Sequence, residues 1–570
     1  MENFDKELAQ YGILAKNGKI FLEGNKITII DAEIKEINFQ TLQEAGIKEI
    51  CISKSEIKYL YFLEKNTIKT DFRNCNFKNQ IIARELYFKN EVIFHQCVFD
   101  AVVDFSKTKF DSRVDFSLSV FKGEVRFIGT QFQAEQSNNE IIENDFREVI
   151  FEGRASFFNA TFKAGVSFVL SRFKDETSFI RARFLAEKDS NKIIENDFRE
   201  TIFEREVSFD NVIFRTGISF AFSQFKNEVR LSISNFLYAK NINFIDIVFG
   251  KLVLQKELFE KSVNFKRCIF LQDVNFKDYT FNEITFNTCI FKGNAYFNNS
   301  NFTKGVDFHE SEFEKTACFY GVKFDETPNF SQTLFKSNIN IINSNLNFDF
   351  TKLDKKIILL SSQGEGKYDY EIANDFRDSF RNFKSALIKD NNLLDASNFH
   401  KYELYCKEIE LKFKKPKTFS REWMDKWQLF FYRKLCDHHT DLLLNLRWLV
   451  VAIGLFALLY FASRVIQDIN LLKVLNQYGV CLSMIGVFNL FCLYWFECIK
   501  KFDFFVCLNL IVVLWVICYM PKIIFGIVNI IGGKSYNGFE NALITIYTIL
   551  LALVLFSLQK TARKNSIVPS

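Results

Sequence analysis

Phenylalanine recurs between residues 72 and 346 at alternating steps of five and six positions, and this spacing constrains the fold more than any other feature. The repeating unit is 11 residues long, and VDFSLSVFKGE, VSFVLSRFKDE and VNFKRCIFLQD are copies of it. Such steps leave any helix face, because helical apolar positions recur every three or four residues. They also do not match a half-buried strand, which alternates with a period of two.

The spacing predicts a solenoid of short coils, in which each step forms one side and one corner and the ring fills the axis. A small or β-branched residue, such as Cys97, Val103 or Ser119, stands two positions before most of the Phe residues and would fit beside the ring. The rings expected in this core include Phe94, Phe99, Phe105, Phe110, Phe116, Phe121, Phe127, Phe168, Phe173, Phe265, Phe270, Phe276, Phe302 and Phe308.

Residues 71–350 resemble the pentapeptide-repeat family, in the variant with one residue inserted in every second repeat. The resemblance implies an all-β solenoid, a right-handed quadrilateral β-helix with four steps per coil. An internal duplication agrees with this number, because residues 138–162 recur 52 positions later and each duplicated block holds eight steps, or two coils. The extra residues at 133–141 and 185–193 are predicted to form loops on the same face.

The segments on either side lack the regular Phe spacing. Residues 1–70 hold short β-prone runs, and we interpret them as an N-terminal cap over the open end of the solenoid. Residues 351–440 are interpreted as a helical connector, since apolar residues recur there at three and four positions and DNN (390–392) marks the turn of a helical hairpin. This connector also resembles the segment that joins pentapeptide repeats to channel-like membrane segments in some bacterial proteins.

A basic and aromatic stretch surrounds Pro416, and it includes Trp423, Trp427, Arg433 and Lys434. Aromatic rings among basic residues can stack on nucleic-acid bases. A membrane interface is favoured here, because segments of hydrocarbon length follow at once and because Trp and basic residues both suit the headgroup region. We therefore expect a lipid bilayer as a partner and no nucleic acid. A DNA mimic would need a strongly acidic rod and is disfavoured, because residues 71–350 hold 35 basic and 38 acidic side chains.

Residues 441–570 are predicted to form a transmembrane domain with about four helices, at 442–462, 478–496, 504–520 and 542–558. Each has the ~17–20 apolar residues that cross a bilayer core. Basic residues before the first segment and after the last place both termini in the cytoplasm. The 13 scattered cysteines and the absence of a visible signal peptide agree with a reducing compartment. The predicted location is a bacterial inner membrane, with the solenoid in the cytoplasm.

Enzyme chemistry is not indicated, because Walker A, GxSxG and GxGxxG motifs are absent from the sequence. Cys436, His438 and His439 belong to CDHHTD (436–441), which is the one cluster of metal-ligand types. Neighbouring residues on a helix point about 100° apart, so they do not converge on one ion. We interpret CDHHTD as a wet polar segment at the membrane surface rather than as a metal or pH-sensing site. No catalytic residue, metal or cofactor is predicted.

The expected function is that of a non-enzymatic membrane scaffold whose solenoid faces bind an unidentified protein. The membrane helices would also allow an oligomer. The alternative is an ion channel or transporter regulated by the solenoid. It draws on PKIIFGIVNIIGGKSYNGFE (521–540), where Pro521 and the glycines would suit a re-entrant loop, although a TVGYG-type filter is absent.

Overall fold

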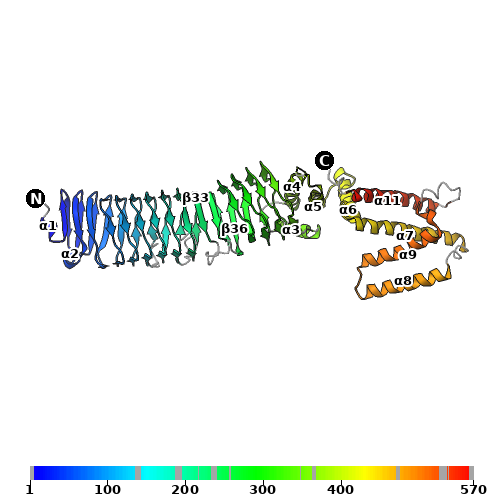
Figure 1. The fold of residues 1–570 in the computed structure, drawn as a ribbon, viewed down its shortest axis with the longest axis horizontal. Helices are drawn as coiled ribbons and strands as arrows, with labels where there is room; N and C mark the ends of the chain where they lie inside the picture. Colours follow the sequence, from blue (N-terminus) through cyan, green and yellow to red (C-terminus); the bar gives the residue numbers. More distant parts are fainter. Residues whose placement is uncertain are drawn as a thin grey trace. The chain divides into compact units, whose positions relative to one another are not determined.

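The structure is a computed structural model, and it describes residues 6–134, 143–186, 196–215, 217–232, 241–255, 258–346, 348, 350–362, 368–389, 391–469, 476–525, 536 and 538–563. The chain divides into two compact units, Met1–Phe348 and Asp349–Ser570 (Figure 1). The first unit is the β-solenoid and the second is helical.

The solenoid begins closer to the N-terminus than predicted. Its first elements are α1 (Lys6–Ala9), β1 (Ile13–Lys16), β2 (Lys19–Glu23), β3 (Lys26–Ile30), β4 (Glu33–Asn38), α2 (Phe39–Glu44), β5 (Glu49–Ser53), β6 (Glu56–Tyr61) and β8 (Lys69–Arg73). β1 pairs antiparallel with β4, and β2 pairs antiparallel with β3. From β3 onward the pairing is parallel, through β5 to β8 and from β4 to β6.

The predicted cap of residues 1–70 is therefore too long, because parallel coils already start at Lys26. The Phe spacing did not reveal these first coils, because isoleucine rather than phenylalanine fills their core. Ile27, Ile50 and Ile57 are buried in these first coils, so an aliphatic core precedes the aromatic one. Only the segment before Lys26 lies outside the parallel pairing.

Four parallel ladders build the regular coils. One coil contains β12 (Val92–His95), β13 (Val98–Phe99), β14 (Val103–Asp104) and β15 (Lys109–Phe110), and the next contains β16 (Val114–Asp115), β17 (Val120–Phe121), β18 (Val125–Arg126) and β19 (Gln131–Phe132). Each residue pairs with the one 22 positions further along, for example Val92 with Val114 and Val98 with Val120. The four steps per coil are thus confirmed.

The ladders continue from β20 (Glu143–Asp145) to β49 (Asn345–Leu346). Some later strands are longer, namely β33 (Gln224–Leu231), β35 (Val248–Leu254), β36 (Leu258–Lys266) and β39 (Thr280–Asn287). The predicted loops at 133–141 and 185–193 lie almost entirely outside the described residues. The strands on either side of each pair at a spacing of 30 residues instead of 22, as Val120 with Ile150 and Arg172 with Ile202.

Two kinds of corner explain why steps of five and six alternate. In the five-residue steps the second residue after the Phe has a left-handed backbone, as at Gln96 (φ 56°), Lys107 (φ 57°) and Leu118 (φ 59°). In the six-residue steps consecutive coils approach closely. A Cβ on Gly123 would lie 2.6 Å from the carbonyl carbon of Ala101 in the coil before. In these regular coils the residue count of a step therefore reports the shape of its corner, whereas the five-residue step from Phe281 to Phe286 runs straight through β39.

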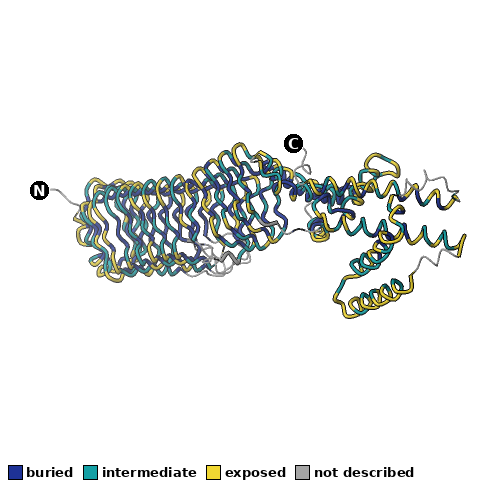
Figure 2. The backbone as a smooth tube through the Cα atoms, turned by 45° about the vertical axis from the view of Figure 1, so that its right-hand side comes forward, coloured by how far each residue is buried: buried dark blue, intermediate teal, exposed yellow. Residues whose placement is uncertain are grey.

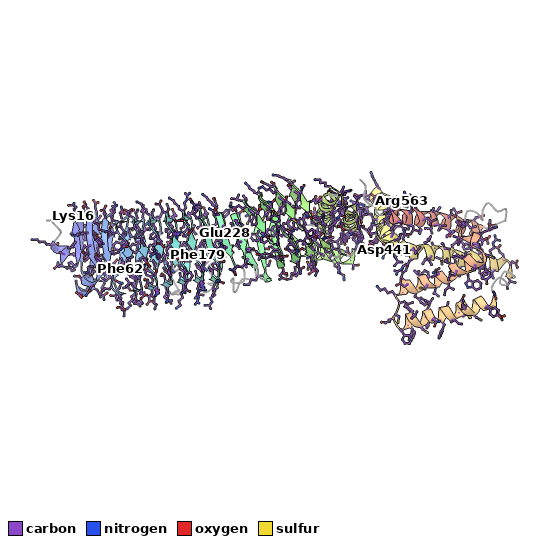
Figure 3. The ribbon with its side chains drawn as sticks, in the orientation of Figure 1. Lys16, Phe62, Phe179, Glu228, Asp441 and Arg563 are labelled. Atoms are coloured by element: carbon purple, nitrogen blue, oxygen red, sulfur yellow. The ribbon has the colours of Figure 1, made fainter. Side chains whose placement is uncertain are left out.

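The 14 predicted core rings are all buried, with no more than 1% of any of them exposed, and buried backbone lines the inside of every coil (Figure 2). Rings stack face to face between coils. The centroid of Phe179 lies 4.8 Å from that of Phe157 and 5.0 Å from that of Phe209, with the planes within 5° of parallel (Figure 3). Offset stacking of this kind adds to the free energy gained from burying each ring.

The second unit contains α3 (Phe350–Ser362), α4 (Asp369–Lys389), α5 (Leu393–Lys414), α6 (Arg421–Cys436), α7 (Leu442–Gln467), α8 (Gln477–Trp495), α9 (Lys501–Tyr519), η2 (Pro521–Ile524) and α11 (Gly538–Ala562). The predicted hairpin corresponds to α4 and α5, whereas α3 was not predicted. Among the described residues, four helices are long and apolar enough to cross a membrane, namely α7, α8, α9 and α11. The segment considered for a re-entrant loop lies mostly outside the described residues.

Among the membrane-length helices, α9 and α11 pack against α7, and α8 packs against α9. The rings of Phe456 on α7 and Tyr547 on α11 stack at 3.8 Å, and Gly454 lets α9 approach so closely that a Cβ there would lie 2.6 Å from Asn509 Oδ1. Trp515 of α9 donates from Nε1 to Ser483 Oγ of α8 at 2.7 Å. No described residue of α8 is buried.

Candidate functional site

Two of the four residues predicted for a membrane interface lie on an exposed part of α6. Ser420 caps this helix, and its Oγ accepts a hydrogen bond from the Trp423 amide at 3.2 Å. Trp423 and Trp427 follow one turn apart with ring centroids at 6.1 Å, and Trp427 is exposed. Lys434, in the last turn of α6, is also exposed, and its carbonyl accepts from Trp448 Nε1 at 2.9 Å.

Arg433 differs from these residues because its side chain is only 16% exposed, and its place at a membrane interface stays a prediction. Its guanidinium forms two hydrogen bonds to the buried Glu408 carboxylate of α5, at 2.7 and 2.8 Å. It also stacks on the Phe350 ring of α3 at 3.8 Å from the centroid. Arg433 therefore joins three helices. The local pattern of basic residues could not show this, because the partners are 25 or more positions away.

The CDHHTD segment forms a tight buried turn between α6 and α7. Asp437, His438 and His439 all have left-handed backbones, with φ of 48°, 55° and 69°. Asp441 then caps α7, and its Oδ1 accepts from the Leu444 amide at 2.8 Å. His438 is 3% exposed and His439 is 9% exposed. The two histidines are therefore not wet as predicted, whereas Asp441 is exposed, and the place of this segment at a membrane surface stays a prediction.

Contacts with α5 hold the turn in place. The Tyr405 hydroxyl donates to Asp437 Oδ1, and Lys401 Nζ lies 3.3 Å from Asp437 Oδ2. The rings of Tyr405 and His438 lie 5.6 Å apart. Burial and the neighbouring Asp437 carboxylate both raise the pKa of the Tyr405 hydroxyl, so it stays protonated as a donor.

His439 contacts α11 through its ring nitrogen Nδ1. Ser557 Oγ, Thr561 Oγ1 and Cys436 Sγ each lie 3.4 Å from His439 Nδ1. The Thr561 hydroxyl donates to the Ser557 carbonyl at 2.7 Å, and the Cys436 thiol donates to the Tyr432 carbonyl at 3.4 Å. Ser557 Oγ also accepts from Asn445 Nδ2 of α7 at 2.9 Å, so His439 lies at a polar junction between the turn, α7 and α11.

Both imidazoles are neutral at pH 7. Burial, together with the nearby Arg433 guanidinium, lowers the pKa of His438 to about 3. Burial and the Lys560 ammonium lower the pKa of His439 to about 4. Burial disfavours the charged imidazolium of each ring, and the neighbouring positive charges of Arg433 and Lys560 disfavour it further.

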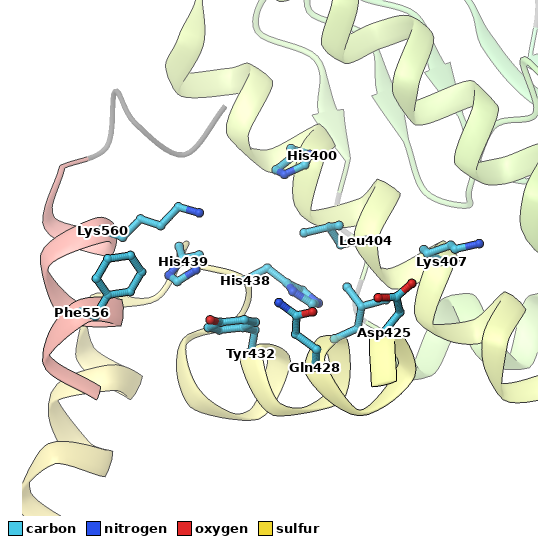
Figure 4. A pocket seen from close by; sticks show the side chains of 11 residues that line it. His400, Leu404, Lys407, Asp425, Gln428, Tyr432, His438, His439, Phe556 and Lys560 are labelled. Carbon is cyan, nitrogen blue, oxygen red and sulfur yellow. The ribbon is translucent and has the colours of Figure 1, made fainter. Parts of the chain in front are cut away.

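A cavity of about 390 Å³ opens beside this turn (Figure 4). It is bounded by α5, α6, the turn and α11, and its lining residues are His400, Leu404, Lys407, Asp425, Gln428, Leu429, Tyr432, His438, His439, Phe556 and Lys560. Neutral hydrogen-bond donors and a lysine from α11 thus face a space large enough for a polar group. Within the described residues, His, Cys, Asp and Glu do not gather in any group of three suited to a metal ion.

A second buried polar cluster lies among the membrane-length helices. Glu540 of α11 is fully buried, and its Oε1 lies 3.2 Å from Arg464 Nε of α7. Ser463 Oγ and Gln467 Nε2 donate to the same oxygen at 3.3 and 3.1 Å. Sequence reasoning missed this pair because α7 and α11 are far apart in the chain. An ionisable pair within membrane-length helices is a recurrent mark of function.

The solenoid carries an unusual edge at one of its left-handed corners. Leu118, Leu170 and Phe222 are 40%, 50% and 58% exposed, and all three have φ near 60°. Glu148 and Glu200 occupy the same corner in the coils between them. We call these five residues the apolar edge. Its apolar side chains recur every second coil, in step with the internal duplication.

The geometry and a family comparison agree on the class of the protein. A family model for pentapeptide repeats matches residues 85–131 and 265–312, with nine copies. Those residues lie in the four-sided coils described above. The chain therefore contains a pentapeptide-repeat solenoid, followed by a helical region in which four of the described helices are able to cross a membrane. Neither a curated protein nor a solved structure matches it.

Proposed function

We propose that this protein is a non-enzymatic scaffold that is anchored in a bilayer by α7, α8, α9 and α11 and that binds another protein along its solenoid. The anchoring part is supported by four helices of sufficient length and apolarity. The solenoid presents a rigid surface, because its core is filled by stacked rings and its coils are hydrogen-bonded throughout. Repeat solenoids commonly use such surfaces for binding.

The apolar edge is the observation that carries the scaffold proposal. A left-handed backbone costs a residue with a Cβ roughly 1–2 kcal/mol, and Gly or Asn avoids most of that cost. Gly129, Asn159 and Asn211 do occupy left-handed corners of this solenoid. Folding thus gains nothing from large apolar side chains at Leu118, Leu170 and Phe222. A partner that covers them would explain their presence.

We further propose that the solenoid and both termini lie in the cytoplasm of a bacterial cell, with the helices in the inner membrane. All 13 cysteines are free thiols, which suits a reducing compartment. Basic residues such as Lys434 and Lys560 lie beside the beginning of α7 and the end of α11, as the positive-inside rule requires for these two ends.

Site-specific photocrosslinking in native membranes tests the scaffold. A benzoylphenylalanine at Leu170 should give one discrete protein adduct, and Phe222→Ser in the same chain should abolish it. Arg181 is the matched control, because it is also exposed and left-handed (φ 59°) but lies on a different corner. Equal adducts at both positions, or none at Leu170, would refute the apolar edge as a binding surface.

An ion channel is the second candidate, and the buried Arg464–Glu540 pair is the observation that favours it. Charged groups inside membrane helices often line ion pathways. Purified protein in planar bilayers separates the two functions. Single-channel currents that change in the Glu540→Gln variant would support the channel function. Bilayers that show no current would rule out the channel function and favour the scaffold.

A further inference from the structure

The cavity beside the CDHHTD turn contains a buried polar atom that the described residues do not pair. His438 Nε2 is buried and has no hydrogen-bond partner among the described residues. The imidazole of His439 lines the same cavity. A buried donor or acceptor without a partner is unfavourable, and in native proteins it usually marks a missing ligand or water.

Lys560 adds a positive charge at the α11 side of the cavity (Figure 4). No acidic group lies within 4.0 Å of its ammonium among the described residues. Two neutral imidazoles beside one ammonium suit a group with a single negative charge, such as a phosphodiester. We propose that this cavity binds the phosphate of a membrane phospholipid that has an amine headgroup.

The position of Lys560 favours a lipid over a free phosphate. Lys560 stands in the last turns of α11, one of the four helices able to cross a membrane. Phe556 lies one turn before it, lines the same cavity and is 60% exposed. A phosphate held at Lys560 would place its acyl chains over Phe556 and along α11. Trp and basic residues on α6 suit the same headgroup depth.

The opposite side of the cavity selects the headgroup. Asp425 of α6 lines it, beside Gln428 and Tyr432. Lys407, also in the lining, is already paired with Glu410 at 2.9 Å. The Asp425 carboxylate would repel a doubly charged inorganic phosphate but attract the ammonium of phosphoethanolamine. Charge complementarity thus matches a zwitterionic headgroup, with its phosphate toward Lys560 and its amine toward Asp425.

Lipid binding to the full-length chain in detergent tests the proposal, with native mass spectrometry and titration of phosphatidylethanolamine, phosphatidylglycerol and inorganic phosphate. Lys560→Gln should weaken phosphatidylethanolamine binding about tenfold, the equivalent of one lost charge-assisted hydrogen bond. His438→Phe should weaken it as well. Asp425→Asn should shift the preference toward phosphatidylglycerol, because it removes the group that attracts the amine.

Lys434→Gln is the matched control, since it removes the same charge from an exposed position outside the cavity lining. It should bind phosphatidylethanolamine as the unaltered protein does. An equal loss in Lys434→Gln and Lys560→Gln would overturn the proposal in favour of diffuse surface attraction. Competition by inorganic phosphate at equal strength would overturn the lipid assignment in favour of a free anion. An unchanged thermal midpoint of lipid-free Lys560→Gln excludes misfolding as the cause.

Discussion

At the scale of single residues, the small inward position of each repeat links coils as well as filling space. Ser119 Oγ accepts from the Cys97 amide at 2.9 Å and donates to the Phe94 carbonyl at 2.6 Å, both in the preceding coil. Ser311 makes the same two contacts with Cys289 and Phe286. Where cysteine occupies the position, its thiol donates in the same way, as Cys268 does to the Phe244 carbonyl at 3.2 Å.

Removal of one such hydroxyl should destabilise the solenoid. Ser119→Ala would leave a buried amide and a buried carbonyl without their partner, at a cost of about 1–3 kcal/mol. Ser119→Cys should recover part of that loss, because a thiol serves at Cys97 and Cys268. Ser112 is the control, since its hydroxyl donates to the Lys89 carbonyl at 2.8 Å on the surface. Denaturant unfolding followed by circular dichroism measures all three, and equal losses for both alanine variants would contradict the bridging role.

The stacked Phe rings of the solenoid core predict different losses of stability for a buried and an exposed phenylalanine. Phe168 lies between Phe146 and Phe198, at 4.9 and 4.8 Å, and Phe168→Ala should lower the free energy of unfolding by about 3–5 kcal/mol. Phe158 is 36% exposed, so Phe158→Ala should cost much less, about 0.5 kcal/mol. Thermal midpoints of the two variants provide the measurement, and similar shifts would show that the rings do not form the core.

At the scale of elements, the strand ladders could be predicted from the repeat spacing. The burial of side chains between helices that are distant in the sequence could not. A five- or six-residue step maps directly onto a corner, so the ladders follow from local sequence. The boundary at Lys26 was hidden because Ile27 and Ile50 replace Phe on the axis. The CDHHTD turn depends on Ser557 and Thr561, more than 100 residues away. Nothing in its local pattern distinguishes an exposed from a buried histidine.

The two buried histidines predict an acid-sensitive helical unit. Their pKa values fall from 6.5 to about 3 and about 4 on folding, so the unfolded chain binds their protons first. Stability should therefore decrease as pH falls from about 6.5 to about 4.5, by at most ~1.4 kcal/mol per pH unit for each ring. Carboxylates such as Glu403, whose folded pKa is about 2, affect stability only below that window.

Thermal midpoints across this pH range measure the effect, with His438→Gln and His439→Gln combined as the comparison. The double variant should be less stable at pH 7 and should show a flatter pH dependence above pH 4.5. An identical pH profile for the unaltered protein and the double variant would show that these imidazoles do not control acid stability.

The buried pair between α5 and α6 predicts another contrast. Arg433→Gln leaves the Glu408 carboxylate buried without its counter-charge, which should cost about 3–5 kcal/mol. Lys434→Gln changes an exposed neighbour and should cost less than about 0.5 kcal/mol. Arg433→Met combined with Glu408→Leu should recover most of the loss, because no charge then remains buried. The rate of limited proteolysis near residue 416 measures the stability of all three variants. If the double variant is cleaved as fast as Arg433→Gln, the buried charge of Glu408 is not the cause of the lost stability.

At the scale of the whole molecule, topology determines which compartment the solenoid shares with its partner. Four spans put the two ends of the helical region on the same side, and the apolar edge can meet only proteins of that compartment. The loop between α7 and α8 would then face the opposite side. The lipid site would lie on the solenoid's side, because Lys560 follows the last span.

Cysteine accessibility in intact cells tests this arrangement, after the native thiols, including the exposed Cys481, Cys498 and Cys518, have been replaced. Asn476→Cys, just before α8, should react with a membrane-impermeant maleimide. Arg181→Cys on the exposed solenoid surface and Arg563→Cys after α11 should react only once the membrane is permeabilised. Labelling of Arg181→Cys in intact cells would invert the topology. Labelling of Arg563→Cys alone would mean an odd number of spans, and would require that one of the four helices lies outside the bilayer.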